Sequence, residues 1–452
     1  MSKFYVSRQT KNLTIKEQSM KGFKIFAKGP TRRRIAGLSA LTLAVSLGVT
    51  LAPAHAASIQ MTFLTPSYLP ADVANIERIV GNWNKANPTT TVKIVYGDPN
   101  NINDQLTTAF AGNVAPDIFQ SEAASLLSFS KQGYVSDITK DMKPLQSDIP
   151  AGLWQTGSFH GRLYGVPTMT QTYTIFANVD LFKKAGVPIP VGSGTLSWDD
   201  FRALAKKLTT PTQYAVGWGL KSPAATFMIM ATNFGGVYFR GLTTGGGPKI
   251  DVTNKELAVP DRVHQMIFDD KTIDPASTLI SGGANEAPFL AGKYPMIVGG
   301  SFVASDLDVA AQAAGFHWTA LPLLKGTVTD AQGANPQTYS ISSQSNYKKP
   351  AAAFIRYLMQ PQNLADLSLG QALIPATNSA AKAALAIKKD SAGWTQILND
   401  SGALTLAPFT LVANYQRWKD TVAQPTFQKW VQGKITRPAM IKALTDGWNS
   451  LQ

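Results

Sequence analysis

The chain has 452 residues, with 42 Lys or Arg against 28 Asp or Glu, no cysteine and a formal net charge of +14. Residues 1–56 carry ten of the basic residues and one acidic residue, hence +9 of that charge. The remaining residues carry only +5 and show no Lys/Arg run interleaved with aromatic residues, which excludes a nucleic-acid partner. The lack of cysteine excludes thiolate metal sites and cysteine nucleophiles.

The leader at residues 1–56 predicts export. Arg32, Arg33 and Arg34 precede an uncharged, mostly apolar run from Ile35 to Pro53, and Ala54-His55-Ala56 follows. A cationic start, an apolar middle and an A-x-A end are typical of a signal peptide, so we expect cleavage near Ala57. A single membrane anchor is the alternative, because the run approaches the ~20 residues that span a bilayer. Glycines and small residues in the run favour cleavage.

The absence of cysteine also bears on location. A bacterial lipid anchor needs a cysteine at the processing site, and this chain has none. An exported protein without an anchor stays with the cell only where an outer membrane retains it. We therefore expect a soluble periplasmic protein that is not lipid-anchored.

After the leader, strand and helix patterns alternate. Near-alternating apolar residues predict a strand over 59–64, and apolar residues spaced by three or four predict a helix from Asp72 to Asn87-Pro88. A strand at 92–96, a helix that stops at Gly112 and a short buried strand at 117–119 follow. This order predicts an open α/β lobe with a largely parallel sheet.

The rest of the chain continues the mixture, and its length predicts two lobes. The expected elements are a strand-rich region at 164–178 broken by Pro167, helices at 181–185 and 198–208 with Ser197 as a cap, a helix at 260–269, strands at 296–299 and 318–321, a helix at 351–359 and a largely helical end from Ala413.

Motifs for catalysis are missing. Gly299-Gly300-Ser301-Phe302-Val303 lacks the closing glycine of a nucleophile elbow, and Gly292-Lys293-Tyr294 fails as a phosphate-binding loop. The histidines have no second histidine at metal-ligand spacing. The sequence therefore predicts no catalytic residue, no metal site and no cofactor. A carboxylate pair for glycoside cleavage stays open, because such residues meet only in three dimensions.

Aromatic and amide side chains are the remaining chemical signal. Phe, Trp and Tyr total 43 residues, and several sit beside Gly, Pro or Ser rather than in helical stripes. Aromatic faces stack on the C–H faces of sugars, while amides and carboxylates bond to hydroxyls. For any single aromatic residue, packing in the core is the alternative.

The order of short motifs resembles the sugar-binding family of extracellular solute-binding proteins of ATP-driven (ABC) importers, which includes maltose-binding protein. No single segment is specific, but they follow the family order over nearly all of the chain after the leader. The segments are the strand before Pro66, Trp83–Pro88, Ala109–Gly112 leading to Ala115–Phe119, Gly161–Pro167, Asn178–Gly186, Ser197–Phe201, Phe289–Lys293 with Met296–Phe302, and Gly370–Pro375.

The resemblance implies an α/β protein of the two-lobe periplasmic-binding-protein type II fold. One lobe would hold 57–170 plus 327–377 and the other 171–326 plus 378–452. A sugar or oligosaccharide would bind between them by hinge closure and pass to the permease subunits of the importer. We expect a monomer that is not an enzyme, since ATP hydrolysis belongs to another subunit.

The resemblance also implies ligand-binding residues. Gln120 and Glu122 follow the Pro116-Asp117 turn into the cleft, Gln171 falls where maltose-binding protein has a carboxylate, and Phe302 falls where the family commonly has a stacking Trp. Asp117 itself is expected to be structural, as a cap for its turn. The full predicted set is Tyr68, Gln120, Glu122, Gln171, Tyr173, Trp218, Phe302 and Trp418, with Trp218 exposed to the cleft.

Two other functions remain as alternatives. One is a secreted carbohydrate-active enzyme, which would convert a glycoside rather than only bind it. The other is the same receptor fold with a polyamine, metal complex or phosphodiester as ligand. A polyamine would need several carboxylates where the predicted set has only Glu122, and an anion would need Arg. These counts favour a neutral sugar.

Overall fold

The computed structural model describes residues 58–66, 69–98, 101–192, 194–241 and 247–451. The predicted signal peptide, its cleavage site and Tyr68 lie outside these ranges. Within them, every helix is too short or too polar to cross a membrane.

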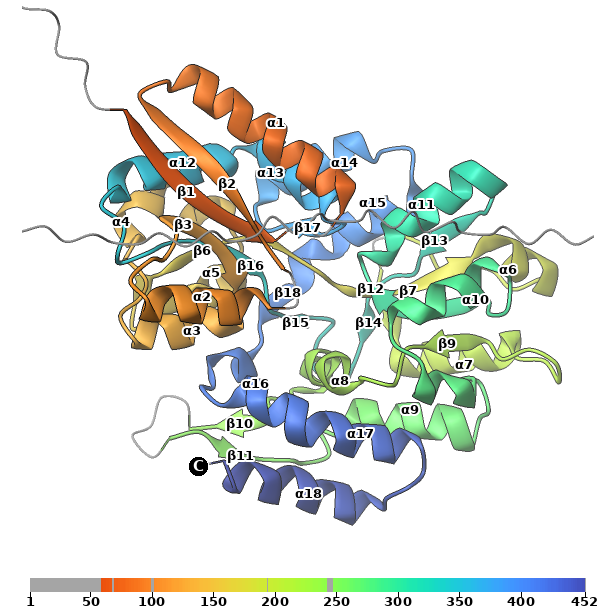
Figure 1. The fold of residues 1–452 in the computed structure, drawn as a ribbon. Helices are drawn as coiled ribbons and strands as arrows, with labels where there is room; N and C mark the ends of the chain where they lie inside the picture. The colour runs from red at the N-terminus through yellow and green to blue at the C-terminus, as the bar shows by residue number, and fades with distance from the viewer. Residues whose placement is uncertain (1–57, 67–68, 99–100, 193, 242–246, 452) are drawn as a thin grey trace, which may run out of the picture. The chain divides into compact units, whose positions relative to one another are not determined.

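One half of the fold is built on a six-stranded sheet in the order β17-β6-β16-β3-β1-β2 (Figure 1). The pairs β1/β2 and β1/β3 are parallel, while β16 pairs antiparallel with β3 and β6, and β17 with β6. The strands are β1 (Ile59–Pro66), β2 (Thr90–Gly97), β3 (Ile118–Glu122), β6 (Gly165–Thr170), β16 (Gln337–Ile341) and β17 (Ile374–Pro375).

Helices cover both faces of this sheet because successive strand residues point to opposite sides. Phe63 of β1 packs on one face with residues of α1 (Pro70–Ala86) and α12 (Lys348–Leu358). Its neighbour Leu64 packs on the other face with α2 (Ile102–Ala111) and α3 (Ala123–Lys131). Most of β1 is therefore buried on both sides, as its apolar composition requires, whereas β2 at the edge of the sheet is partly exposed.

The other half is built on a four-stranded sheet in the order β13-β7-β12-β9. Here β7 pairs antiparallel with β12 and β13, and β12 pairs parallel with β9. The strands are β7 (Tyr173–Asn178), β9 (Val216–Trp218), β12 (Met296–Gly300) and β13 (Trp318–Ala320).

The same alternation buries both faces of the second sheet. Ile175 of β7 joins the core of α7 (Trp198–Leu208) and α9 (Ala258–Phe268). The next residue, Phe176, joins Val303 and Leu307 of α11 (Val303–Ala314) on the opposite face.

Short elements complete the fold. The two-stranded ladders are β4 (Ser158–Phe159) with β5 (Arg162–Leu163), β8 (Leu196–Ser197) with β14 (Leu324–Lys325), β10 (Phe239–Arg240) with β11 (Lys249–Ile250), and β15 (Gln332–Ala334) with β18 (Leu404–Leu406). The other α-helices are α4 (Thr139–Met142), α5 (Ala151–Thr156), α6 (Val179–Ala185), α8 (Ala224–Ala231), α10 (Glu286–Leu290), α13 (Pro361–Gly370), α14 (Asn378–Ile387), α15 (Ala392–Asn399), α16 (Tyr415–Trp418), α17 (Gln424–Val431) and α18 (Arg437–Asn449). The 3₁₀ helices are η1 (Lys143–Asp148), η2 (Thr232–Phe234), η3 (Pro275–Leu279), η4 (Gly283–Asn285), η5 (Asp400–Ala403) and η6 (Pro408–Leu411), and η7 (Lys419–Ala423) is a π-helix.

Most expected elements are confirmed, including the Ser197 cap, whose side chain accepts from the Asp200 N–H. Two expectations are wrong. The first sheet is mixed rather than largely parallel, because β16 inserts between β3 and β6 with opposite direction. The strand-rich region breaks after Thr170 rather than at Pro167, which lies inside β6 opposite Thr338, beside a shift in register. A proline without an N–H is tolerated at such an irregularity.

Asp117 is structural, but it bonds across the sheet rather than capping its own turn. Its Oδ2 accepts from the Thr62 N–H at 2.8 Å and the Thr62 hydroxyl at 3.0 Å. Its Oδ1 accepts from the Ser345 hydroxyl at 2.6 Å. One carboxylate thus ties β1 to the start of β3 and to the loop after β16.

Replacing this carboxylate should loosen the first sheet. We expect Asp117→Ala to lower the free energy of unfolding by about 2–4 kcal/mol, because hydrogen bonds to a charged acceptor are lost and their donors are left unpaired. Urea unfolding followed by tryptophan fluorescence measures the loss. Asp390→Ala, at an exposed residue, is the control and should change stability by no more than about 0.5 kcal/mol. Equal unfolding curves for both variants would contradict this role.

Candidate functional site

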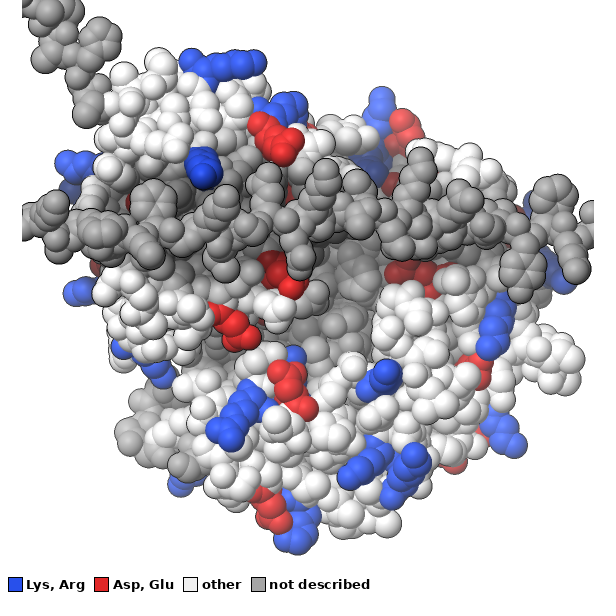
Figure 2. Space-filling view, viewed as in Figure 1, with Lys and Arg blue, Asp and Glu red and all other residues white. Residues whose placement is uncertain are grey.

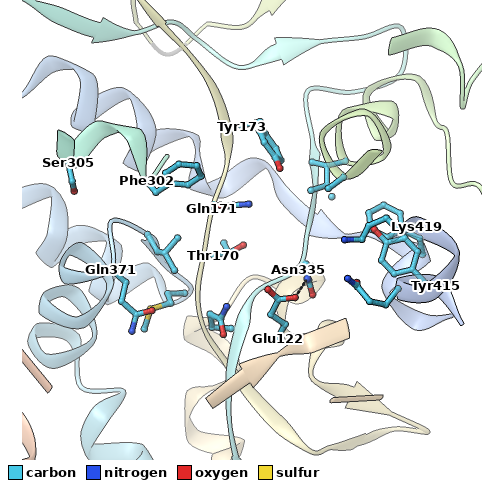
Figure 3. Close-up of a pocket in the computed structure, with 18 of the residues that line it drawn as sticks. Glu122, Thr170, Gln171, Tyr173, Phe302, Ser305, Asn335, Gln371, Tyr415 and Lys419 are labelled. Atoms are coloured by element: carbon cyan, nitrogen blue, oxygen red, sulfur yellow. Dashed lines mark hydrogen bonds between the residues drawn. The ribbon is translucent and has the colours of Figure 1, made fainter. Parts of the chain in front are cut away.

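A cavity of about 520 Å³ lies between the two halves, and both sheets contribute to its lining (Figure 3). Figure 2 shows a hollow in the middle of the same face of the molecule. The volume is within the range of ordinary small-molecule sites. The cavity therefore is the candidate binding site.

The middle of the lining comes from the segment where β6 passes into β7. Thr170, Gln171 and Tyr173 all lie here (Figure 3). Thr170 is buried, and its hydroxyl has no hydrogen-bond partner within the described ranges. Burial raises the pKa of Tyr173, with a smaller contribution from Glu122, so its phenol stays neutral over the physiological range.

A buried amide fixes this crossing segment. The Gln332 side chain accepts from the Tyr173 N–H at 2.9 Å and donates to the Tyr173 carbonyl at 2.8 Å. Gln332 is only 1% exposed and belongs to β15. In sequence, β15 follows the last strand of the second sheet, β13, and precedes β16 of the first sheet. Two crossing strands are thus held together at the cavity by one side chain.

The end of β3 supplies a carboxylate. Glu122 Oε2 accepts from the Asn335 Nδ2 at 3.0 Å, and Asn335 Oδ1 accepts from the Ala124 N–H at 3.0 Å. Both side chains line the cavity. They offer a mixed set of donors and acceptors to a polar ligand.

Gln371 lines the cavity and is held from behind by a buried chain of hydrogen bonds. Its amide donates to Asp72 Oδ1 at 3.0 Å and accepts from Gln120 Nε2 at 3.4 Å. Gln120 in turn accepts from the Thr65 hydroxyl at 2.8 Å. The orientation of Gln371 is therefore set before any ligand binds.

Phe302 and the start of α11 form one end of the cavity. The Phe302 ring is 38% exposed and lies against Gly300, where a Cβ would be 2.5 Å from a ring carbon and 3.1 Å from Gln171 Oε1. Only glycine leaves room for the ring at this place. Ser305 and Asp306 follow on the same face of the helix and also line the cavity.

Tyr415, Gln416 and Lys419 form the other end. The Tyr415 ring packs on Phe409 with 4.8 Å between ring centroids, and burial raises its pKa well above the ordinary value. Lys419 Nζ lies 3.0 Å from Asp420 Oδ1. Lys419 begins a π-helical turn, a feature that is frequent at functional sites.

Two carboxyl groups, Glu286 and Asp306, interact beside the Phe302 end. Glu286 at the start of α10 bonds to Asp306, and burial together with the Asp306 charge raises the pKa of Glu286 to about 8. Glu286 thus is mostly protonated at neutral pH and donates to Asp306.

Four of the predicted ligand residues are brought together in the lining: Glu122, Gln171, Tyr173 and Phe302. Gln120 is fully buried and supports Gln371 instead of facing the cavity. Tyr68 lies outside the described residues. A ligand role for the four lining residues stays a prediction.

The two predicted tryptophans differ from expectation. Trp218 is 2% exposed and packs edge-on against Phe227, because strand alternation places it with Val216 on the core face of β9. Trp418 is fully buried, and its indole N–H donates to the Leu444 carbonyl at 3.0 Å. Neither lines the cavity.

Several lining residues were missed from sequence. Tyr415 had no usable signal, because Trp418, three residues later in the chain, is fully buried and does not line the cavity. Gln371 sits inside the Gly370–Pro375 segment that carried the resemblance. Asp306, Asn335 and Thr170 had no sequence signal, since each is a common polar residue placed only by the fold.

The site offers recognition chemistry. The described residues include no group of three or more His, Cys, Asp or Glu side chains able to hold a metal ion. Amides, hydroxyls and aromatic rings dominate the lining, with Glu122, Asp306 and Lys419 as the charged members. Such a surface suits a polar ligand with many hydroxyls.

Comparison with known proteins identifies the family. Residues 79–430 match the family model described as bacterial extracellular solute-binding protein. The chain belongs to this family of solute-binding proteins. An uncharacterized lipoprotein from the oleD 5′ region of Streptomyces antibioticus is 34% identical over 382 residues, 84% of each chain.

Solved structures show the fold of this solute-binding protein. The sugar-binding protein MalE of Xanthomonas citri superposes with a TM-score of 0.73 at 19% identity, over 86% of this chain and 95% of that one. The GacH receptor of Streptomyces glaucescens gives 0.70 at 18% identity, over 87% and 98%. The predicted type II fold and the resemblance to the maltose-binding family are confirmed. These two neighbours are a receptor and a binding protein by name, not enzymes.

The prediction of a periplasmic protein without a lipid anchor is wrong. The Streptomyces antibioticus relative is named a lipoprotein. This name points to a membrane-anchored extracellular protein rather than to one that diffuses freely in a periplasm. The prediction rested on the lack of cysteine, and no residue that is present in the chain supported it.

The proton of Glu286 should make stability depend on pH. Its folded pKa of about 8 exceeds the ordinary 4.5, so its contribution to stability is complete below about pH 4.5 and is lost as pH rises through 8. We expect the wild type to lose at least about 1 kcal/mol relative to Glu286→Gln between about pH 5 and 9. Urea unfolding of both proteins at several pH values measures this, and parallel pH profiles would contradict it.

Proposed function

We propose that this protein is the receptor of an ATP-driven importer, binds a sugar or oligosaccharide in the cavity and delivers it to a permease. The lobes would be 57–170 plus 327–377 and 171–326 plus 378–452, closing on the ligand about the strands that cross between them. Residues 1–56 would direct export. The receptor would act as a monomer and release its ligand unchanged.

The lining of the cavity is the observation that carries this proposal. Gln171, Asn335 and Gln371 present amides, while Phe302 and Tyr415 present aromatic rings at opposite ends (Figure 3). Amides satisfy hydroxyls as donor and acceptor at once, and rings cover the apolar faces of a sugar. The rings at both ends favour a ligand of more than one sugar unit.

An anionic ligand is disfavoured by the same lining. Lys419 is the one cation that lines the cavity among the described residues, and Asp420 already pairs with it. Anion sites usually present Arg or several backbone N–H groups. The structural neighbours agree with a carbohydrate ligand, since the GacH receptor was solved in complex with acarbose and MalE is called sugar-binding.

A glycoside hydrolase is the competing function, and the visible carboxyl pair does not fit it. Glu286 and Asp306 bond directly to each other, whereas the two carboxyls of glycosidases stand about 5–9.5 Å apart to flank the scissile bond.

Titration with a panel of mono- and oligosaccharides, followed by tryptophan fluorescence, tests the proposal. We expect at least one sugar to bind with micromolar or tighter affinity. Phe302→Ala should weaken that binding at least about tenfold by removing a stacking surface. Phe268→Ala, which removes a ring that is 41% exposed on α9, is the matched control and should bind normally.

The same samples distinguish the alternatives. Recovery of the sugar unaltered after long incubation supports a receptor, and a cleaved product would establish the enzyme instead. Failure of every sugar to bind would overturn the carbohydrate ligand. Equal affinity of Phe302→Ala and wild type would remove Phe302 from the site.

A further inference from the structure

One end of the cavity combines an aromatic ring with a carboxylate. Phe302, Ser305 and Asp306 are spaced by three and four residues at the start of α11, so they share one helix face, and all three line the cavity. Figure 3 shows Phe302 and Ser305 at the side of the cavity opposite Tyr415 and Lys419.

The carboxylate at this end has no cationic partner. Among the described residues, no Lys, Arg or His forms an ion pair with Asp306 or with Glu286. Asp308, two residues along the same helix, differs, because Lys388 Nζ lies 2.7 Å and the Trp394 indole nitrogen 2.8 Å from its Oδ2. The unpaired carboxylate is the one that faces the cavity.

The neighbouring acid makes the lack of a cation more significant. Burial and the nearby Asp306 carboxyl raise the pKa of Glu286 to about 8, so Glu286 keeps its proton at neutral pH. Two adjacent carboxyls without a cation cannot both ionise cheaply, and a positive charge placed beside them relieves the repulsion. At the other end, Lys419 lies 3.0 Å from Asp420, so a carboxylate there already has a cationic partner.

We propose that the ligand of this receptor carries a protonated amine at the Phe302 end, where Asp306 binds it and the Phe302 ring packs against it. Aromatic faces attract ammonium groups, and a carboxylate beside the ring completes the recognition of such a group. The ligand class is then an amino sugar or an oligosaccharide that contains one. The inference rests on the proposed carbohydrate-binding function.

A free metal ion suits the site less well than an amine. Calcium takes six to eight oxygen ligands, whereas only Asp306 and Glu286 are available here, and one of them keeps a proton. The described residues hold no larger cluster of metal-binding side chains. Adding Ca²⁺ alone is therefore part of the test.

The test compares pairs of sugars that differ by one substitution of amine for hydroxyl or acetamide. Glucosamine against glucose, galactosamine against galactose, and the glucosamine trimer against its N-acetylated form and cellotriose are suitable probes. We expect the amine-bearing member of at least one pair to bind about tenfold or more tightly than its partner in calorimetry.

Asp306→Asn decides whether the site causes the preference. This isosteric change should abolish the tenfold difference between the two members of the pair, because the charge that distinguishes them has been removed. Asp390→Asn, at an exposed carboxylate in the turn after α14, is the control and should keep the preference. Circular dichroism and melting temperature show that each variant is folded.

Proton release gives a second readout that a merely structural role would not produce. An ammonium group beside Asp306 and Glu286 should expel the proton of Glu286. Calorimetry at neutral pH in two buffers of different ionisation enthalpy measures this release. We expect the wild type to release a proton on binding and Glu286→Gln to release none. The other acids near α10 and α11, Asp308 and Asp274, are already paired with Lys388 and Lys293.

The outcomes separate the two proposals. Binding of neutral sugars without any preference for an amine would overturn the amine subsite and leave the carbohydrate receptor standing. A preference that survives Asp306→Asn, or tight binding of Ca²⁺ alone to this pair, would also overturn the subsite. Failure of every sugar, charged or neutral, would overturn both.

Discussion

The contact between the Gln332 side chain and the backbone of Tyr173 is the interaction on which the site depends. A buried amide that accepts from the N–H and donates to the carbonyl of one residue reproduces the pairing of a neighbouring strand. It does so at the start of β7, where Gly300 of β12 pairs in register with Tyr173 but the Tyr173 N–H and carbonyl are bound by Gln332. The two halves of the fold are therefore joined by a defined geometry, and the residues on either side face one shared cavity.

On the side of the first sheet, buried hydrogen bonds hold the polar lining in place. Thr65, Gln120, Gln371 and Asp72 form a chain of hydrogen bonds, of which only Gln371 reaches the cavity. Buried polar groups of this kind are costly unless satisfied, and once satisfied they fix side-chain orientation. The ligand thus meets a preformed amide, which lowers the entropy lost on binding.

The sequence predicts the elements well and the cavity only in part. Periodicity locates α1 and α7, because the spacing of their apolar residues marks the face that each helix buries, and Ser197 marks the start of α7. The insertion of β16 into the first sheet has no local signature, since its partner strands lie over 160 residues earlier in the chain.

The candidate ligand residues, like the helices and strands, could be predicted only where the local sequence marks them. Glu122 and Phe302 were found because each follows a recognisable turn or strand end. Trp218 and Trp418 were misplaced because a tryptophan beside glycine, or in a terminal helix, reads the same whether it faces the core or a cleft. Asp306 was missed because its lack of a cation is a property of its surroundings and not of its neighbours in sequence.

The proposed closure about the crossing strands would give the Asp306 carboxylate a further role. Bringing the halves together would remove water from Asp306, and a carboxylate that loses water without gaining a cationic partner opposes closing. An empty cavity would then stay open, and a ligand without a cation at this end would close it incompletely. A ligand that supplies the charge removes this penalty, so its binding energy and the closed state are coupled through one side chain. Selectivity would arise here as much from what Asp306 disfavours as from what it binds.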